Sequence, residues 1–173
     1  MALRELVFCD TSNALAKALS THVPRPTAVV GVGNPLRGDD GFGPAVARAV
    51  PACDNLFPFD VQGVPESFLV PIVQTGCRGV LFVDAAALGT QPGRVALVPA
   101  ARLTDVDVST HAVALALVAE AIQELAREAD GRDVACALVG AEPASLETPD
   151  TLSPAAEAAV RLAAAGIRAF GSA

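Results

Sequence analysis

Five short apolar segments along the chain have the pattern of buried β-strands. Residues 79–84 and 134–140 are largely apolar, which favours strands covered on both faces of a sheet. Strands buried in this way belong to parallel sheets with helices on either side. The five predicted strands are residues 28–33, 57–61, 79–84, 94–98 and 134–140.

Segments with helical spacing of apolar residues alternate with these strands. They are residues 42–50, 65–75, 110–128 and 153–168. Ser153 and Pro154 form an N-cap and a proline in the first turn, whereas Pro71 predicts that the helix at 65–75 is kinked or split. The alternation predicts an α/β fold, namely a three-layer αβα sandwich around a mainly parallel, twisted sheet of about five strands.

The length fits a single domain spanning residues 1–173. A short helix at 12–20 and the proline-containing segment 23–27 precede the first core strand. We therefore interpret residues 1–27 as an N-terminal extension of that domain.

Composition restricts the class of protein. Hydrophobic residues make up 52% of the chain, but charged residues interrupt the long apolar runs, so we expect no membrane insertion. The net charge of −7 opposes binding to nucleic acid. The first residues lack the pattern of a signal peptide, and the four cysteines (Cys9, Cys53, Cys77 and Cys136) lie far apart without C-x-x-C spacing. We expect reduced thiols and a cytoplasmic protein, with Cys136 in the core.

The first core strand ends in a glycine-rich turn with two consecutive aspartates. Residues 31–44 read GVGNPLRGDDGFGP. A helix beginning near residues 40–43 would place Asp39 and Asp40 beside its positive end, with one of them capping the helix and the other facing a cleft.

Three polar residues, Asp40, Asp84 and His111, are predicted to meet at one edge of the sheet. Asp40 follows the first core strand, Asp84 ends the strand at 79–84, and His111 lies at the start of the helix at 110–128. Ligands of open α/β sheets bind at the carboxyl ends of the strands. Two carboxylates and an imidazole form a ligand set for a divalent transition metal, which can position a water or polarise a carbonyl. Each residue alone also fits a purely structural role.

Other kinds of site fit less well. A G-x-G-x-x-G motif would require glycine at position 36, which is Leu36, and the lysine of a P-loop is absent. The chain has no G-x-S-x-G motif, and no cysteine has an activating context near His111. Serine and cysteine peptidase chemistry is therefore disfavoured.

Residues 31–43 resemble the signature of the hydrogenase maturation endopeptidases, which process the large subunit of nickel–iron hydrogenases. The resemblance covers roughly residues 28–168, through 83–85, 92–93, 109–111 and 138–147. Residues 65–66 and 109–111 are closest to the subgroup that acts on formate-hydrogenlyase-type and cofactor-F420-type hydrogenases. The resemblance implies an endopeptidase that removes a C-terminal extension from a large-subunit precursor after nickel insertion.

The resemblance also implies roles for particular residues. Asp40, Asp84 and His111 match the positions that hold nickel in the family, and we expect them to serve as both metal ligands and catalytic residues, with nickel supplied mainly by the precursor. Residues expected to recognise substrate or to support these ligands are Asn34, Asp39, Asp60 and Gly63.

One segment departs from the family pattern. The family often has two glycines directly after the acidic residue that ends the second core strand, in a loop associated with substrate recognition. Here Asp60 is followed by Val61 and Gln62, whose larger side chains could reshape the cleft. Two alternative functions stay open: a noncatalytic nickel checkpoint or chaperone that binds the precursor, and a metal-dependent hydrolase of a small molecule.

Overall fold

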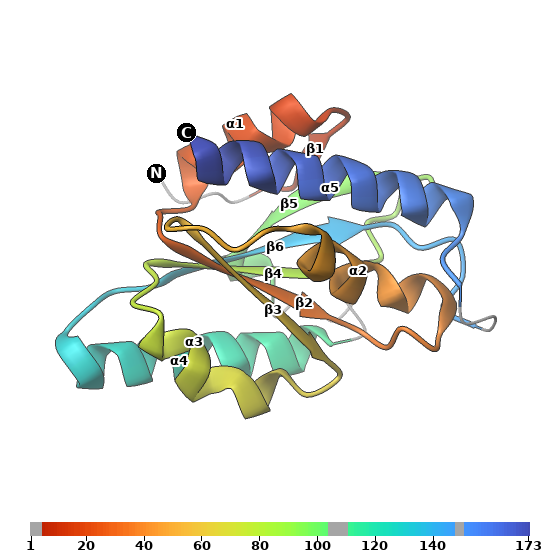
Figure 1. The fold of residues 1–173 in the computed structure, drawn as a ribbon. Coiled ribbons are helices and arrows are strands. Elements are labelled where there is room, and N and C mark those ends of the chain that lie inside the picture. Colours follow the sequence, from red (N-terminus) through yellow and green to blue (C-terminus); the bar gives the residue numbers. More distant parts are fainter. Residues whose placement is uncertain (1–4, 104–110, 148–150) are drawn as a thin grey trace.

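A six-stranded sheet lies between two layers of helices in the computed structural model, which describes residues 5–103, 111–147 and 151–173 (Figure 1). The strand order is β1-β5-β6-β4-β2-β3. Strands β2, β3, β4 and β6 are parallel, and β5 runs antiparallel to both of its neighbours. The strands are β1 Val7–Cys9, β2 Thr27–Val32, β3 Leu56–Gln62, β4 Gly79–Ala85, β5 Val95–Pro99 and β6 Ala135–Ala141. The prediction of an αβα sandwich with a mainly parallel sheet is confirmed.

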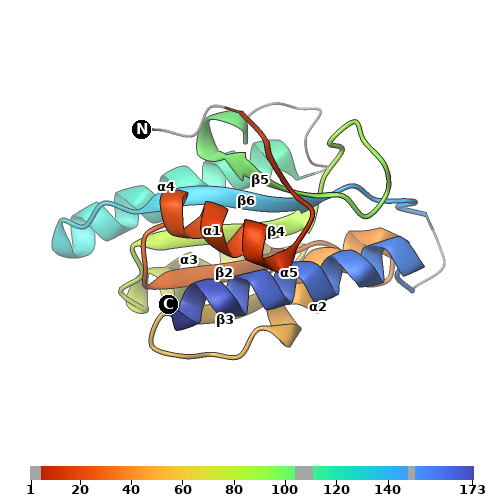
Figure 2. The same ribbon diagram turned by 90° about the horizontal axis from the view of Figure 1, so that it is seen from above.

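The helices divide between the two faces of the sheet. Helices α1, α2 and α5 cover one face, and α3 and α4 cover the other, as Figures 1 and 2 show from two directions. The α-helices are α1 Ser12–His22, α2 Phe42–Ala49, α3 Leu69–Gln74, α4 Ala112–Asp130 and α5 Pro154–Ser172. Three short 3-10 helices connect other elements: η1 Gly38–Gly41, η2 Pro65–Phe68 and η3 Ala100–Arg102.

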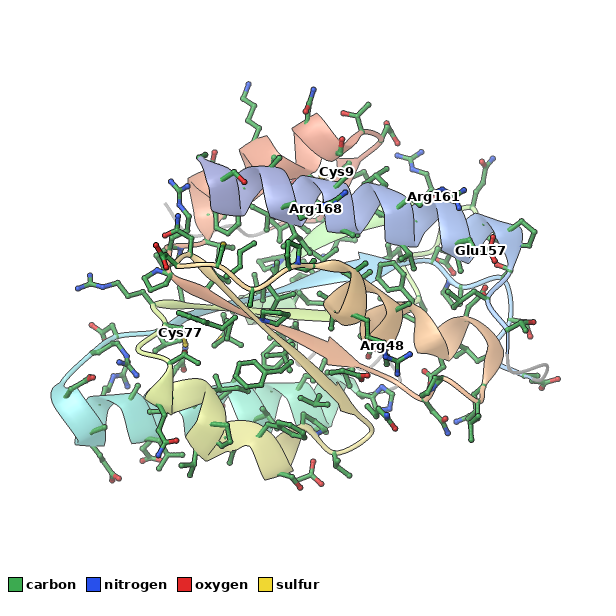
Figure 3. The ribbon with its side chains drawn as sticks, viewed as in Figure 1. Cys9, Arg48, Cys77, Glu157, Arg161 and Arg168 are labelled. Carbon is green, nitrogen blue, oxygen red and sulfur yellow. The ribbon has the colours of Figure 1, made fainter. Side chains whose placement is uncertain are left out.

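Each face of the sheet has its own hydrophobic core. Cys9 belongs to the core beneath α1, α2 and α5, and Cys77 to the core beneath α3 and α4. Figure 3 shows these two cysteines on opposite sides of the sheet. Every residue of β2 and β4 is buried, as expected for central strands covered on both faces. These two strands therefore form the most completely buried part of the sheet.

Helix α5 illustrates how the sequence pattern produces this layering. Its buried residues recur every three or four positions, so they form one face of the helix. The charged side chains of Glu157, Arg161 and Arg168 are exposed on the other side (Figure 3). Ser153 caps the helix by accepting a hydrogen bond from the N–H of Ala156, and Pro154 occupies the first helical position, as predicted.

The sheet has one more strand than the apolar pattern predicts. The additional strand, β1, pairs antiparallel with β5 at the edge of the sheet. With only three residues, β1 is too short for an alternation of apolar and polar positions to be recognised in the sequence. The segment 65–75 is split into η2 and α3, as predicted, and Pro71 lies in the first turn of α3, where a missing N–H is tolerated.

The four cysteines form no disulfide, and three of them are buried. Cys136 is a core residue, as predicted, and burial raises the pKa of its thiol to about 12. Within the described part of the chain, no helix combines the length and apolar character that crossing a membrane requires.

Candidate functional site

Asp40, Asp84 and His111 meet at the carboxyl edge of the parallel strands. Asp84 is the penultimate residue of β4, Asp40 lies in η1 directly after the turn that follows β2, and His111 directly precedes α4. Because β2 and β4 are adjacent and parallel, their ends lie side by side. One ligand atom from each of the three residues lies within 4.8 Å of the other two. We call these three residues the trio.

His111 is directly bound to Asp84. The distance from His111 Nδ1 to Asp84 Oδ2 is 3.0 Å, and the side chain of Asp84 is completely buried while that of His111 is 26% exposed. The hydrogen bond from the imidazole to Asp84 raises the pKa of His111, partial burial opposes this shift, and the negative charges of Asp84 and Asp40 reinforce it. The carboxylate therefore favours the protonated imidazole when no metal competes for the ring.

The carboxylate of Asp40 is fixed by the backbone of the preceding turn. Asp40 is 2% exposed, and its Oδ2 accepts a hydrogen bond of 2.8 Å from the N–H of Asn34. The side chain of Asn34 closes the turn by accepting a hydrogen bond of 2.9 Å from the N–H of Leu36. Asn34, expected to recognise substrate or support the ligands, thus contacts Asp40 through its backbone.

Glycines permit the close packing that brings these residues together. Gly33 has a φ of 129°, and a Cβ there would overlap the carbonyl oxygen of Asp40. At Gly43, in the first turn of α2, a Cβ would lie 2.7 Å from the backbone N of Val32 and would overlap the carbonyl oxygen of Val83. The two glycines let η1 and α2 approach the ends of β2 and β4 directly.

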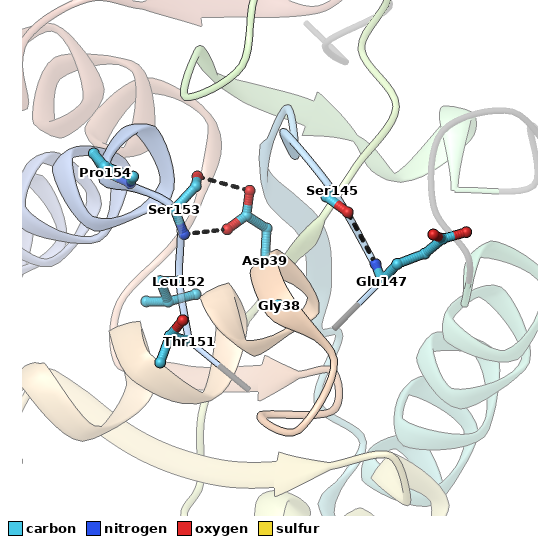
Figure 4. A pocket seen from close by; sticks show the side chains of 8 residues that line it. All are labelled: Gly38, Asp39, Ser145, Glu147, Thr151, Leu152, Ser153 and Pro154. Atoms are coloured by element: carbon cyan, nitrogen blue, oxygen red, sulfur yellow. Dashed lines mark hydrogen bonds between the residues drawn. The ribbon is translucent and has the colours of Figure 1, made fainter. Parts of the chain in front are cut away.

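Asp39 is not part of the trio and binds a segment that is distant in the sequence. Its Oδ1 accepts a hydrogen bond of 2.7 Å from the N–H of Ser153, and its Oδ2 accepts one of 2.8 Å from the Ser153 hydroxyl (Figure 4). Oδ2 also accepts a hydrogen bond of 2.7 Å from the N–H of Ala144. The prediction that one aspartate caps the following helix is wrong, because the N-cap of α2 is Gly41 and makes no side-chain cap bond. Asp39 instead holds the β6–α5 connection against η1.

A pocket of about 240 Å³ lies beside Asp39. It contains none of the trio, so the candidate metal ligands lie outside it. Its wall is formed by Gly38, Asp39, Ser145, Glu147, Thr151, Leu152, Ser153 and Pro154, which Figure 4 shows from close by.

Asp60 and Gly63 lie on the neighbouring strand end and the loop after it. Asp60 Oδ2 is 2.7 Å from Nε of Arg48 in α2, an ion pair that sequence reasoning did not identify. No atom lies within 4 Å of a Cβ built on Gly63. Among the described residues, the cluster that could hold a metal includes neither of them. Their part in substrate recognition stays a prediction.

Gln62, which follows Val61 in the segment where the sequence departs from the expected glycines, has an unusual backbone conformation. This residue has a φ of 49°, in the left-handed region where glycine is favoured. Its carbonyl accepts a hydrogen bond of 2.9 Å from the N–H of Gly33, and the β2–β3 register shifts between Gly31 and Val32. The loop after β3 is thus joined to the turn that leads to Asp40.

The donor set of the trio suits a divalent transition metal. Imidazole binds zinc, copper, iron and nickel, and carboxylates complete such sites. Two buried carboxylates close together are costly unless a proton or a cation balances their charge. His111 supplies one partial balance, and a divalent ion would supply a larger one. The three residues therefore fit a metal ion by their chemistry as well as by their spacing.

Known proteins resemble this chain in sequence and in fold. The family model described as HycI, hydrogenase maturation protease, matches residues 62–169, a range that includes Asp84 and His111. The curated hydrogenase 3 maturation protease of Escherichia coli K12 is 35% identical over 69 residues, which are 39% of this chain and 44% of that relative. The alignment thus spans less than half of the curated protein.

Solved structures give longer matches. The NiFe hydrogenase maturation protease HycI from Thermococcus kodakarensis KOD1 has a TM-score of 0.71 and 30% identity, covering 90% of this chain and 97% of that one. The hydrogenase maturating endopeptidase HybD from E. coli has a TM-score of 0.66 and 25% identity, covering 82% and 88%. Since the family model covers more than half of the chain, the protein belongs to the hydrogenase maturation protease family.

Proposed function

We propose that this protein is an endopeptidase that removes the C-terminal extension of a nickel–iron hydrogenase large-subunit precursor. Family membership and the names of the similar structures support peptide hydrolysis during hydrogenase maturation. The observation that carries the proposal is the convergence of Asp40, Asp84 and His111, with ligand atoms within 4.8 Å of one another at the carboxyl edge of the sheet. The narrower subgroup suggested by residues 65–66 and 109–111 is part of this proposal.

In this proposal the nickel ion belongs to the substrate. The trio binds the nickel carried by the precursor and so holds the adjoining peptide bond in a fixed position. A divalent ion at that position polarises a carbonyl or activates a water. Metal binding requires His111 to lose one proton, because a doubly protonated imidazole has no lone pair for a metal. The Nδ1–H that faces Asp84 is retained if Nε2 is the ligand atom and is lost if Nδ1 is. Because the nickel arrives with the precursor, the protease would purify largely without metal.

We also place this reaction in the cytoplasm. The four thiols form no disulfide, which suits a reducing compartment.

The proposal is tested by the intact mass of a large-subunit precursor before and after incubation with the protein. Nickel-loaded and nickel-free precursors are compared, with the wild type, Asp84→Asn, His111→Ala and Asp133→Asn as proteases. Asp133 is a matched surface control because its side chain is 86% exposed and lies in an exposed ion pair. We expect the wild type and Asp133→Asn to remove the C-terminal peptide from the loaded precursor alone.

Asp84→Asn and His111→Ala should leave the precursor intact while retaining a cooperative unfolding transition. Full processing by both variants would overturn the role of the trio. Stable binding of the wild type to loaded precursor without loss of mass would instead favour a checkpoint or chaperone. Tightly bound metal in the purified protein, together with inactivity on precursor, would favour a hydrolase of small molecules.

A further inference from the structure

The turn between β2 and η1, which leads to Asp40 of the trio, carries two exposed side chains. Leu36 is 66% exposed and Arg37 is also exposed, whereas the next three residues, 38–40, are buried. An apolar and a cationic side chain thus project from the segment that directly precedes Asp40.

The backbone of this turn is fixed relative to the carboxylate of Asp40. The N–H of Arg37 donates to the carbonyl of Asn34 at 3.0 Å, and the N–H of Asp40 donates to the carbonyl of Arg37 at 3.1 Å. The N–H of Asn34 binds Oδ2 of Asp40 at 2.8 Å. The Cα atom of Arg37 is therefore held one short turn from the metal-ligand candidate, and only its side chain is left to move.

Arg37 has no partner of opposite charge among the residues that the structure describes. Arg37 stands only three residues before Asp40, in a turn whose backbone is bonded to Asp40, and its side chain is exposed. No carboxylate among the described residues forms an ion pair with it. A positive charge on the turn that leads to Asp40 also repels a divalent cation. Arg37 therefore does not serve metal binding.

We propose that Arg37 binds a negatively charged oxygen of the precursor and thereby positions the scissile peptide bond beside the trio. This inference rests on the proposed function. The carboxylates of Asp40 and Asp84 balance one divalent ion, which leaves the charge of Arg37 for one further anionic oxygen. The planar guanidinium can donate two hydrogen bonds to such an oxygen group.

That oxygen can have two sources. It is either a carboxylate of the precursor near the nickel-bound segment or the oxyanion formed during hydrolysis. In the second case a water oxygen bonds to the carbonyl carbon, the water releases a proton to solvent, and the π electrons of the carbonyl move to its oxygen. The carbonyl then re-forms as the C–N bond breaks, and the leaving nitrogen takes a proton. A precursor carboxylate is bound before reaction, whereas the oxyanion is bound only in the transition state.

The test is single-turnover cleavage of nickel-loaded precursor at increasing protease concentration, which separates the maximal rate from the half-saturating concentration. The proteases are the wild type, Arg37→Ala, Arg37→Lys and Arg78→Ala. Arg78 is a matched exposed arginine that directly precedes β4, at the opposite end of that strand from Asp84. Thermal unfolding of each variant checks that the fold is retained.

We expect Arg37→Ala to lower the maximal rate divided by the half-saturating concentration about ten- to a hundredfold. This is the size of effect that loss of a charge-assisted hydrogen bond produces. Arg37→Lys should recover part of that loss, and Arg78→Ala should match the wild type. A higher half-saturating concentration identifies a precursor carboxylate, and a lower maximal rate identifies the oxyanion.

Wild-type processing by a folded Arg37→Ala protein would overturn the proposal for Arg37 while leaving the proposed function intact. Equal losses in Arg37→Ala and Arg78→Ala would overturn it as well, because a general effect of surface charge would then explain both. If the wild type itself fails to cleave the loaded precursor, the proposed function fails, and the assignment of Arg37 fails with it.

Discussion

His111 Nδ1 and Asp84 Oδ2 lie 3.0 Å apart, although the two residues are 27 positions apart in the sequence. Asp84 is held at the end of a fully buried strand, and His111 lies at the start of α4 on one side of the sheet. The contact therefore joins a central strand to the helical layer. Protonation of His111 is therefore coupled to folding through Asp84, and a metal ion would compete with the proton for the imidazole.

The pKa of His111 predicts how the stability of the metal-free protein depends on pH. Because the hydrogen bond to Asp84 raises this pKa above its ordinary value of 6.5, the folded state binds the proton more tightly than the unfolded state. The stabilisation is fully present below pH 6.5 and is lost as the pH rises through the folded-state pKa. Urea denaturation across this range should show the wild type losing its advantage over His111→Asn at higher pH.

His22→Asn is the matched control for this measurement, since His22 is the other histidine of the chain. A change in pH dependence that appears equally in both variants would not come from the Asp84 contact. An identical pH dependence in the wild type and His111→Asn would show that the Asp84 contact does not couple protonation to folding.

Asp39→Ala should destabilise the protein through the β6–α5 connection. The substitution removes the acceptor for the N–H groups of Ala144 and Ser153 and for the Ser153 hydroxyl. Hydrogen bonds to a charged group contribute roughly 1.5–3 kcal/mol each, and less where water can replace the acceptor of a partly buried donor, so the free energy of unfolding should fall in urea. Asp39→Asn keeps one acceptor oxygen and should have a smaller effect.

The same variants separate structural support from metal chemistry. Asp39→Asn should process nickel-loaded precursor better than Asp84→Asn, because Asp39 contacts the β6–α5 connection and Asp84 belongs to the trio. Complete loss of processing in a stably folded Asp39→Asn protein would contradict this division.

Thiol accessibility distinguishes the cysteines. Cys53 is exposed, whereas Cys9, Cys77 and Cys136 are buried. Iodoacetamide at pH 8 should add one group to the folded protein, at Cys53, and four after unfolding in denaturant. Peptide mass mapping checks the position. Rapid modification of Cys136 in the folded state would be incompatible with its buried thiol, whose pKa is raised to about 12.

The location of the trio could be predicted because it depends on a general property of parallel sheets. Asp84 ends a strand that is recognisable from its apolar run, and Asp40 follows another such strand. Once β2 and β4 are adjacent, their carboxyl ends must meet. A histidine at a helix start is by itself more often structural, so His111 was predicted only jointly with the two aspartates, and the family resemblance then pointed to the same three residues.

The partners of Asp39 could not be predicted in this way. Ala144 and Ser153 are 105 and 114 positions away in the sequence, and no local pattern states which aspartate of a pair turns toward them. The ion pair of Arg48 with Asp60 likewise depends on the packing of α2 beside β3. Strand β1 was missed because its pairing with β5 depends on tertiary contact.

Gly43→Ala and Gly63→Ala form a matched pair that tests the packing beneath the site. A Cβ at Gly43 would overlap the carbonyl oxygens of Val32 and Val83, so α2 and η1 must move away from the strand ends. We expect a marked loss of stability and, because Asp40 lies in η1, loss of precursor processing.

Gly63→Ala makes the same change of one methyl group where no atom lies within 4 Å of the new Cβ. Its free energy of unfolding should stay within about 0.5 kcal/mol of the wild type. Urea denaturation of both variants makes the comparison, and a stable Gly43→Ala protein would mean that close packing of α2 does not hold Asp40 in place. Processing by the stable Gly63→Ala protein then reports on recognition alone, because a defect without loss of stability would assign the loop after β3 to the precursor.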